Sequence, residues 1–286
     1  MVTWKRWTAR VLIASTVATS GFGVYVYLAN QRLLDRRYEV MRAPMPVAAG
    51  PEAVQRGKRL ADLTGCTDCH RPDLRGGLFG DDNWLHGRYY ASNLTRKALQ
   101  YSDEDFARIV REGVRPDGRG VAAMPAMGFV RLTDAEMADI MAFVRSMPAG
   151  GAEQPDHFIG LLDSWDLWRG DVNQPAVSYV AAERVKDPAE IGPEHAASRH
   201  LARIVCAECH GGDLKGNGWD SGAPDLAVVQ AYGLADFTRL MRTGIGVDGK
   251  EHGLMTAVAK ARFTHFSDDE IAALHGYLVA RAQART

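Results

Sequence analysis

Two pentapeptides carry most of the information in this chain: Cys66-Thr67-Asp68-Cys69-His70 and Cys206-Ala207-Glu208-Cys209-His210. Each has the pattern C-x-x-C-H, which is the attachment sequence for c-type haem. In such a site the two thiols add to the two vinyl groups of the haem, and the adjacent imidazole binds the iron. The chain has four cysteines, and all four lie in these pentapeptides. The sequence therefore predicts two covalently bound haem c groups, attached through Cys66, Cys69, Cys206 and Cys209.

Other uses of a C-x-x-C pair are a disulfide, a thioredoxin-like redox pair or half of a zinc site. A zinc site usually has its second cysteine pair within a few tens of residues. Here Cys69 and Cys206 are 137 positions apart. A thioredoxin-like pair lies beside a βαβ pattern, and the sequence shows no such pattern. These comparisons favour haem attachment at both pairs.

The two halves of the chain repeat the same order of elements. Seven positions separate Phe106 from Gly113, and the same number separates Phe237 from Gly244. Each half also has a capping box before its final apolar helix, Thr133 to Glu136 in the first and Ser267 to Glu270 in the second. A long period with this matching predicts two copies of one small helical domain.

The repeat also indicates the second ligand of each iron. His70 and His210 provide the first, and methionine or histidine usually provides the other. Met124 and Met255 each lie eleven residues after the equivalent glycine, so we predict these two as ligands. Alternative ligands are Met127 and His86 in the first copy and His252 in the second. The remaining histidines have no counterpart in the other copy, and we predict that they are ordinary surface or core residues: His157, His195, His200, His265 and His275.

The N-terminal segment is apolar and long enough to cross a bilayer. It runs uncharged from Val11 to Gln31 after a short basic stretch, and about 20 apolar residues span a membrane as a helix. A cleaved signal peptide is the alternative, with small residues at Val17 to Ser20. Apolar character resumes through Tyr25 to Leu28, which favours an uncleaved anchor. Because bacteria attach c-type haem outside the cytoplasmic membrane, we expect a single-pass inner-membrane protein with its haem domains in the periplasm.

The predicted organisation has four parts: an anchor and flank (1–40), a first haem domain (41–150), a joining segment (151–193) and a second haem domain (194–286). The joining segment contains Trp165 and Trp168, so we expect it to pack onto a haem domain or onto a partner. The net charge of −1 gives no indication of a nucleic-acid partner. Residues 244–249 fit G-x-G-x-x-G, but a helix is expected before them and a loop after them, which is the wrong context for dinucleotide binding.

Beyond these motifs, the chain resembles the class I cytochrome c family in a tandem di-haem form. The stretches Ala91 to Thr95, Tyr101 to Phe106 and Gly113 to Gly118 look like the cytochrome subunits of membrane-bound alcohol and sugar-acid dehydrogenases. Those subunits usually carry three haem motifs, whereas this chain has two. The Pro-x-Leu segment of many family members is present as Pro224-Asp225-Leu226, and Asn93-Leu94 stands in for it in the first copy.

This resemblance implies an all-α fold in which two cytochrome c domains follow one transmembrane helix. It also implies an electron carrier without catalysis of its own. Electrons would pass from a dehydrogenase or quinol-oxidising complex to an oxidase or soluble cytochrome. Two alternatives remain: a subunit of a cbb3-type oxidase, and a haem enzyme such as a di-haem peroxidase or thiosulfate dehydrogenase.

Overall fold

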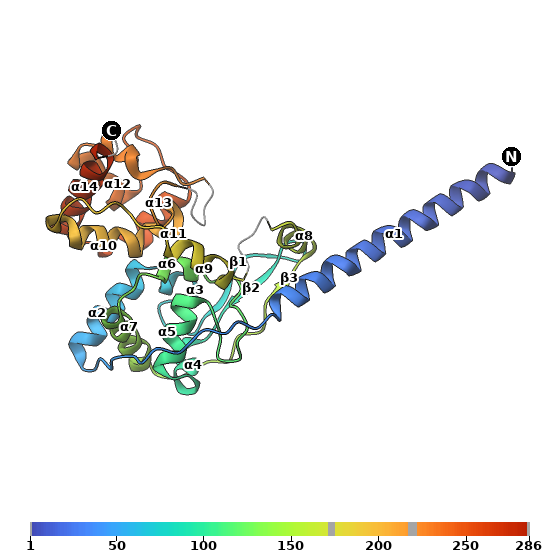
Figure 1. Cartoon of the computed structure of the whole chain (residues 1–286), viewed down its shortest axis with the longest axis horizontal. Helices are drawn as coiled ribbons and strands as arrows, with labels where there is room; N and C mark the ends of the chain where they lie inside the picture. The colour runs from blue at the N-terminus through green and yellow to red at the C-terminus, as the bar shows by residue number, and fades with distance from the viewer. Residues whose placement is uncertain (1, 171–174, 217–221, 285–286) are drawn as a thin grey trace.

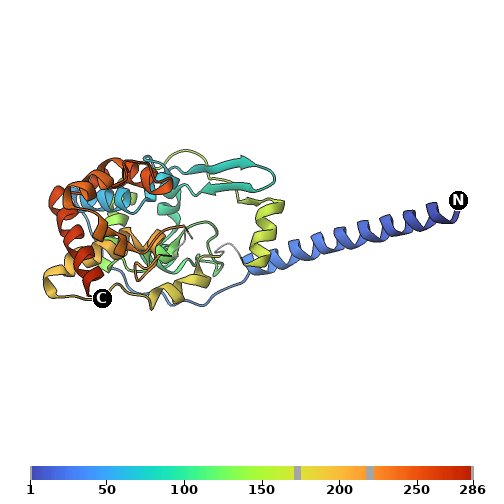
Figure 2. The same ribbon diagram turned by 90° about the horizontal axis from the view of Figure 1, so that it is seen from above.

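A computed structural model describes residues 2–170, 175–216 and 222–284. One long helix, α1, projects from a body made of two helical lobes (Figures 1 and 2). The first lobe holds the blue-green part of the chain and the second holds the orange and red part. Parts of the predicted joining segment and second domain, 171–174, 217–221 and 285–286, lie outside the described residues.

The elements follow one another in the order expected from the repeat. The first lobe and its flank contain α1 (Val2–Leu34), α2 (Pro51–Leu63), α3 (Cys66–His70), β1 (Gly77–Asn83), β2 (Gly87–Ala91), α4 (Leu94–Gln100), α5 (Asp103–Glu112), α6 (Ala126–Phe129) and α7 (Asp134–Ser146). The joining segment contains β3 (Phe158–Ile159), α8 (Leu161–Arg169) and α9 (Val177–Arg184). The second lobe contains η1 (Pro193–His195), α10 (Ala196–Val205), α11 (Ala207–His210), η2 (Leu226–Ala231), α12 (Leu234–Thr243), α13 (Leu254–Ala261), η3 (Phe263–His265) and α14 (Asp268–Gln283).

The predicted helical repeat is confirmed. Both capping boxes form, at the start of α7 and at the start of α14. The helices α5 and α12 both end at a glycine in the left-handed conformation, Gly113 with φ 67° and Gly244 with φ 73°. A left-handed residue after the last turn is a common helix stop, and glycine adopts it without a Cβ clash. In the first lobe this stop directs the chain into the loop that carries Met124, and in the second lobe into the loop that precedes α13, whose first turn contains Met255.

The first lobe depends on a close crossing of α2 and α7. A Cβ atom added at Gly57 would lie 1.8 Å from the carbonyl oxygen of Asp139, so only glycine permits this approach. Beside the crossing, Arg56 donates two hydrogen bonds to the carboxylate of Asp139, at 2.7 and 2.9 Å. The crossing packs α7, the last helix of the lobe, against α2, which leads directly into the α3 turn.

The first lobe contains a small antiparallel sheet, although the sequence predicted an all-α fold. Strand β1 pairs with β2, and β2 pairs with β3. Phe79 and Tyr89 face each other across the first pair with ring centroids 6.3 Å apart. In β1 and β2 the alternation of apolar and polar residues is short and interrupted by glycines, so the sequence gives only a weak strand signal. Strand β3 comes from a segment about 70 residues after β2. Apart from this sheet, the lobes are helical as predicted.

The joining segment packs onto the first lobe and onto α1. Ala176 and Val180, at and within α9, are buried in a cluster with Val121, Ala126 and Met127 of the first lobe. Helix α8 instead lies against α1, where it stands beside the end nearest the body (Figure 2). The ring of Trp168 meets that of Phe22 edge-on, with centroids 5.4 Å apart. The described parts of the segment, on both sides of residues 171–174, therefore pack onto the rest of the fold and are not a free linker.

Helix α1 is long and apolar enough to cross a membrane. Its candidate span is Trp4–Leu34, with a mean hydropathy of 1.6 in the best 18-residue window and 6% of that window buried. Most of its large apolar side chains are exposed, and Figure 1 shows that the helix extends away from the body along most of its length.

We expect Gly57→Ala to destabilise the protein. The added methyl group would collide with backbone of α7, and overpacking of this kind costs about 1–3 kcal/mol. Thermal unfolding of the haem-loaded protein should show a melting temperature lowered by roughly 2–4 °C for each kcal/mol. The matched control is Gly276→Ala in α14, where nothing lies within 4 Å of the added atom. The control should be neutral or stabilising by up to about 1 kcal/mol, and an equal loss in both variants would contradict the close crossing.

Candidate haem-binding sites

The first cysteine pair lies on a short helix that a glycine sets at an angle to α2. Helix α2 ends at Leu63, and Gly65 adopts a left-handed conformation with φ 76° before α3 begins at Cys66. Within α3, residues three positions apart lie on the same side of the helix. Cys66 and Cys69 are therefore presented together, with His70 directly after them. In the second lobe, Cys206 is the residue between α10 and α11, and Cys209 and His210 follow on α11.

Both histidines are oriented by the same hydrogen bond. The Nδ1 atom of His70 lies 2.8 Å from the carbonyl oxygen of Ser92, and that of His210 lies 2.8 Å from the carbonyl oxygen of Pro224. A carbonyl oxygen only accepts, so Nδ1 carries the proton in each case and Nε2 keeps its lone pair. Burial lowers the pKa of His70 below its usual value, which favours the neutral ring. This is the state and orientation that an iron ligand requires.

The two accepting carbonyls are held by matching turns. Leu74 and Leu214 are fully buried and have positive φ angles, 56° and 61°. The carbonyl oxygen of Leu74 accepts from the backbone N–H of Leu94 at 2.8 Å, and the corresponding bond from Leu226 to Leu214 is 3.0 Å. Ser92-Asn93-Leu94 thus has the structural place of Pro224-Asp225-Leu226. The correspondence that the sequence indicated between these segments holds in three dimensions.

A largely apolar cavity opens above the first pair of thiols. Cys66, Cys69, His70 and Met124 all line it. Met127 does not line this cavity and is buried in the cluster beside α9. The cavity therefore brings together the predicted cysteines, histidine and methionine of the first site.

The alternative histidine ligands are engaged elsewhere. His86 lies 2.9 Å from Asp163 of the joining segment, and His252 lies 3.2 Å from Asp248. Both imidazoles are about half exposed, with side-chain exposures of 53% and 42%. Met255 is half-buried in the first turn of α13. This arrangement favours Met255 over His252 as the ligand in the second lobe.

The thiols of Cys66, Cys69 and Cys206 have the raised pKa of buried thiols in apolar surroundings, which differs from the lowered pKa of a reactive redox pair. Burial raises the pKa of Cys66 and of Cys69 above the usual value, and raises the pKa of Cys206 to about 12. Thioredoxin-like cysteines have a lowered pKa, because the thiolate is their reactive form. Among the described residues, no three His, Cys, Asp or Glu side chains gather as a metal-ion site would need. Paired thiols, an oriented imidazole and apolar walls together fit a covalently bound haem.

Sequence reasoning missed several polar residues of the first cavity. His157 of the joining segment lines it, although it was expected to be an ordinary histidine, and so does Arg115. The Nδ1 atom of His157 accepts from the backbone N–H of Tyr90 at 3.0 Å. Burial and the nearby Arg115 lower the pKa of His157, so it remains neutral. No repeat partner marks these positions, and the fold alone brings the joining segment to the cavity.

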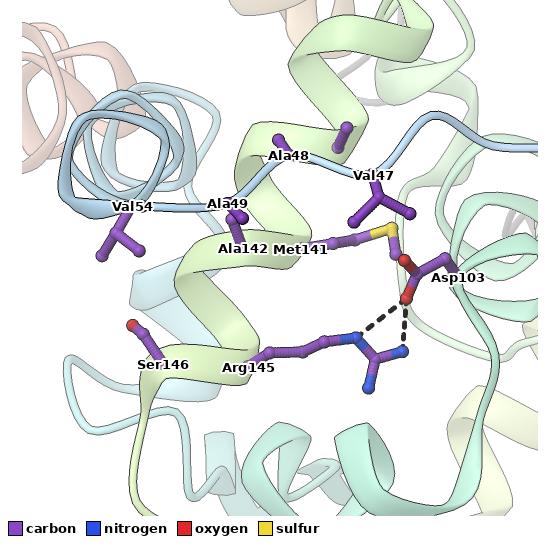
Figure 3. Close-up of a pocket in the computed structure, with 11 residues that line it drawn as sticks. Val47, Ala48, Ala49, Val54, Asp103, Met141, Ala142, Arg145 and Ser146 are labelled. Carbon is purple, nitrogen blue, oxygen red and sulfur yellow. Dashed lines mark hydrogen bonds and ion pairs between the residues drawn. The ribbon is translucent and has the colours of Figure 1, made fainter.

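A second hollow lies on another face of the first lobe, where the tether Val47–Gly50 crosses α7 (Figure 3). Figure 3 shows Arg145 paired with Asp103 at its edge, and Met141 pointing into it. Its lining includes none of the cysteines or of the predicted iron ligands. It is a gap beneath the tether, and of the described residues only Met141 lines both this hollow and the first cavity.

The chain is similar to cytochrome subunits of several dehydrogenases. It is 27% identical over 259 residues to the cytochrome c subunit of the quinone-dependent alcohol dehydrogenase of Gluconobacter oxydans, covering 79% of this chain and 54% of the relative. It is 23% identical to the fructose dehydrogenase cytochrome subunit of Gluconobacter japonicus, covering 82% and 54%. It is 26% identical to the gluconate 2-dehydrogenase cytochrome c subunit of Pantoea cypripedii, covering 80% and 60%. The chain thus spans little more than half the length of these relatives.

The sequence profile of the cytochrome c family matches the chain twice, at residues 54–148 and at residues 196–281. Each matched segment contains one C-x-x-C-H turn, one oriented histidine and one final helix. Together the two segments account for well over half of the chain. On the basis of these two matches and of the repeated haem-binding geometry, the chain belongs to the cytochrome c family.

Proposed function

We propose that this protein is a di-haem cytochrome that transfers electrons as part of, or in partnership with, a membrane-bound dehydrogenase. The observation that carries the proposal is the pair of corresponding sites, each with two thiols and a histidine whose Nδ1 is hydrogen-bonded to a backbone carbonyl. When bound, each haem supplies a one-electron redox centre. The protein supplies attachment, ligands and apolar walls that exclude water.

The ligand set is proposed from the placement of the side chains. Cys66 and Cys69 would hold the first haem, with His70 and Met124 on its iron. In the second lobe, Cys206 and Cys209 would hold the haem, and His210 and Met255 would bind the iron. Histidine with methionine raises the reduction potential relative to more basic ligand pairs. With both axial positions filled, neither iron would have a vacant place for a substrate.

The relatives support a dehydrogenase as the redox partner. Three relatives are named as cytochrome subunits of alcohol, fructose and gluconate dehydrogenases. This favours a dehydrogenase subunit over the cbb3-type oxidase subunit and over a haem enzyme. Electrons would enter from the dehydrogenase and leave to an oxidase or a soluble cytochrome of the respiratory chain.

We further infer that α1 anchors the protein in the bacterial inner membrane, with both lobes in the periplasm. The apolar side chains of α1 have few partners in the body, so a bilayer is the environment that would bury them. Near the body, Phe22 and Tyr25 meet Trp165 and Trp168 of α8. Tryptophan and tyrosine are enriched where a span leaves the hydrocarbon region. This aromatic group lies in the half of the helix that is nearer the body, and it would hold the first lobe close to the membrane.

The methionine ligands can be tested spectroscopically. The ferric protein should show a near-infrared band from sulfur-to-iron charge transfer, and Met124→Ala should remove about half of it. Met127→Ala is the matched control: it truncates a buried side chain at a cost of about 2–5 kcal/mol, but it should leave the band intact. Loss of the band in Met127→Ala and its persistence in Met124→Ala would show that Met127, and not Met124, binds the iron.

The carrier assignment predicts poor binding of external ligands. Pyridine haemochrome should give two haems per chain, and the reduced protein should bind carbon monoxide slowly and incompletely, because a methionine must leave first. Met255→Ala opens one position and should bind carbon monoxide rapidly, which provides the positive control. Rapid binding by the unaltered protein, together with turnover of hydrogen peroxide or thiosulfate, would instead indicate a haem enzyme.

The anchor can be tested by the mass of the mature protein. Protein from carbonate-washed membranes should retain residues before Val11, whereas a chain that starts near Ser20 and is released by osmotic shock would indicate a signal peptide. Val17→Arg places a charge near the middle of the span at a cost of roughly 2.5–3.5 kcal/mol and should reduce membrane retention. Gln31→Arg, at the end of the helix, should not.

A further inference from the structure

One arginine joins the two haem-attachment turns. The Nε atom of Arg262 lies 2.6 Å from Oδ2 of Asp68, and its Nη1 atom lies 2.8 Å from Oε2 of Glu208. Asp68 is the second variable residue of the first C-x-x-C-H motif, and Glu208 has the same place in the second motif. A single guanidinium therefore bridges equivalent positions of the two copies, from a residue that belongs to neither motif.

The bridge is largely withdrawn from water. The side chains of Arg262, Glu208 and Asp68 are 13%, 11% and 35% exposed. Burial by itself would lower the pKa of Arg262, but the two carboxylates outweigh that effect and raise it. Arg262 also lies directly over the first turn, because a Cβ atom at Gly65 would come within 2.1 Å of its Cζ. A buried, two-sided pair of this kind is far more specific in geometry than an exposed ion pair.

The repeat shows why the bridge can form. Phe129 corresponds to Phe263, so the residue before it, Gly128, corresponds to Arg262. A Cβ atom at Gly128 would lie 3.0 Å from the Cβ of Glu208. Glycine at position 128 therefore leaves space for the attachment turn of the second lobe, which contains Glu208. At equivalent positions, one copy has the smallest residue and the other has the bridging cation. The two lobes thus meet asymmetrically, with their attachment turns together.

The bridge also borders the first cavity. Arg262 and Glu208, both from the second lobe, line the cavity that contains Cys66 and Cys69. The wall of the first site that adjoins its thiols is therefore completed by the second attachment turn. Other interdomain pairs, Arg59 with Glu270 and His200 with Glu136, do not involve these turns.

We propose that Arg262 is a positioning residue for electron transfer between the two haems: it holds the attachment turns against each other and offsets one of the two negative charges between them. The inference rests on the proposed function in that both turns must carry haem. Without the guanidinium, Asp68 and Glu208 would leave uncompensated negative charge beside both sites. Nearby negative charge favours the ferric state of a haem, so both reduction potentials should fall.

The test compares Arg262→Met with Arg59→Met, which breaks a different interdomain ion pair and serves as the matched control. Redox titration should show the ferrous-to-ferric ratio falling about tenfold for both haems in Arg262→Met, which is about 59 mV for a one-electron couple. Pulsed electron paramagnetic resonance should show a weaker coupling between the two ferric irons. Arg59→Met should change neither quantity.

A rescue variant separates charge from packing. Adding Asp68→Asn and Glu208→Gln to Arg262→Met takes the net charge of the three side chains from −2 to 0, compared with −1 in the unaltered protein. Both potentials should therefore rise to or above their original values while the iron–iron coupling stays weak. If Arg262→Met alone does not accumulate, this triple variant can be measured in its place, because it has no repulsion between the side chains at positions 68 and 208. Unchanged potentials and coupling in Arg262→Met, or equal changes in Arg59→Met, would overturn the proposal. Haem content below two per chain in the unaltered protein would instead refute the proposed function.

Discussion

The hydrogen bond between a histidine Nδ1 atom and a backbone carbonyl is the interaction on which both proposed haem sites depend. It occurs at 2.8 Å in each lobe, from His70 to Ser92 and from His210 to Pro224. The bond fixes the tautomer and the plane of the ring, so that Nε2 is the ring nitrogen that carries the lone pair. To provide those carbonyls, each lobe folds a buried leucine with positive φ under the site. The turns around Leu74 and Leu214 are therefore a requirement of the chemistry as much as of packing.

The second organising feature is the contact between the lobes. Arg262 pairs with one carboxylate from each attachment turn, and Gly128 admits Glu208 at the corresponding place of the first copy. A duplicated domain has no intrinsic reason to place its two sites near each other. Here a glycine in one copy and an arginine in the other make that arrangement possible, since a buried cation requires both of its partners. The two sites are thereby parts of one unit.

Much of the fold was predictable because it is local. The two capping boxes and the apolar helices that follow them, α7 and α14, depend on residues a few positions apart, and the structure confirms them. The equivalent glycines Gly113 and Gly244 both end a helix, α5 in one lobe and α12 in the other. The sheet and the role of His157 were not predictable in the same way. β3 pairs with a strand about 70 residues earlier, and His157 reaches the cavity because that pairing directs it there. Likewise, the packing of Trp168 on Phe22 joins segments that share no sequence pattern.

The sequence by itself determined the attachment chemistry, the duplication, the apolar N-terminal helix and the correspondence of Met124 with Met255. Each of these follows from the spacing, composition or periodicity of the residues, which can be analysed without knowledge of the fold. Only the tertiary structure decided which methionine of the first copy lines the cavity, where the joining segment packs and how the two attachment turns meet. Those features depend on side chains that are distant in sequence and become neighbours when apolar surface is buried. Asp68 and Glu208 are ordinary variable positions in their motifs, and they gain significance only because folding places Arg262 between them.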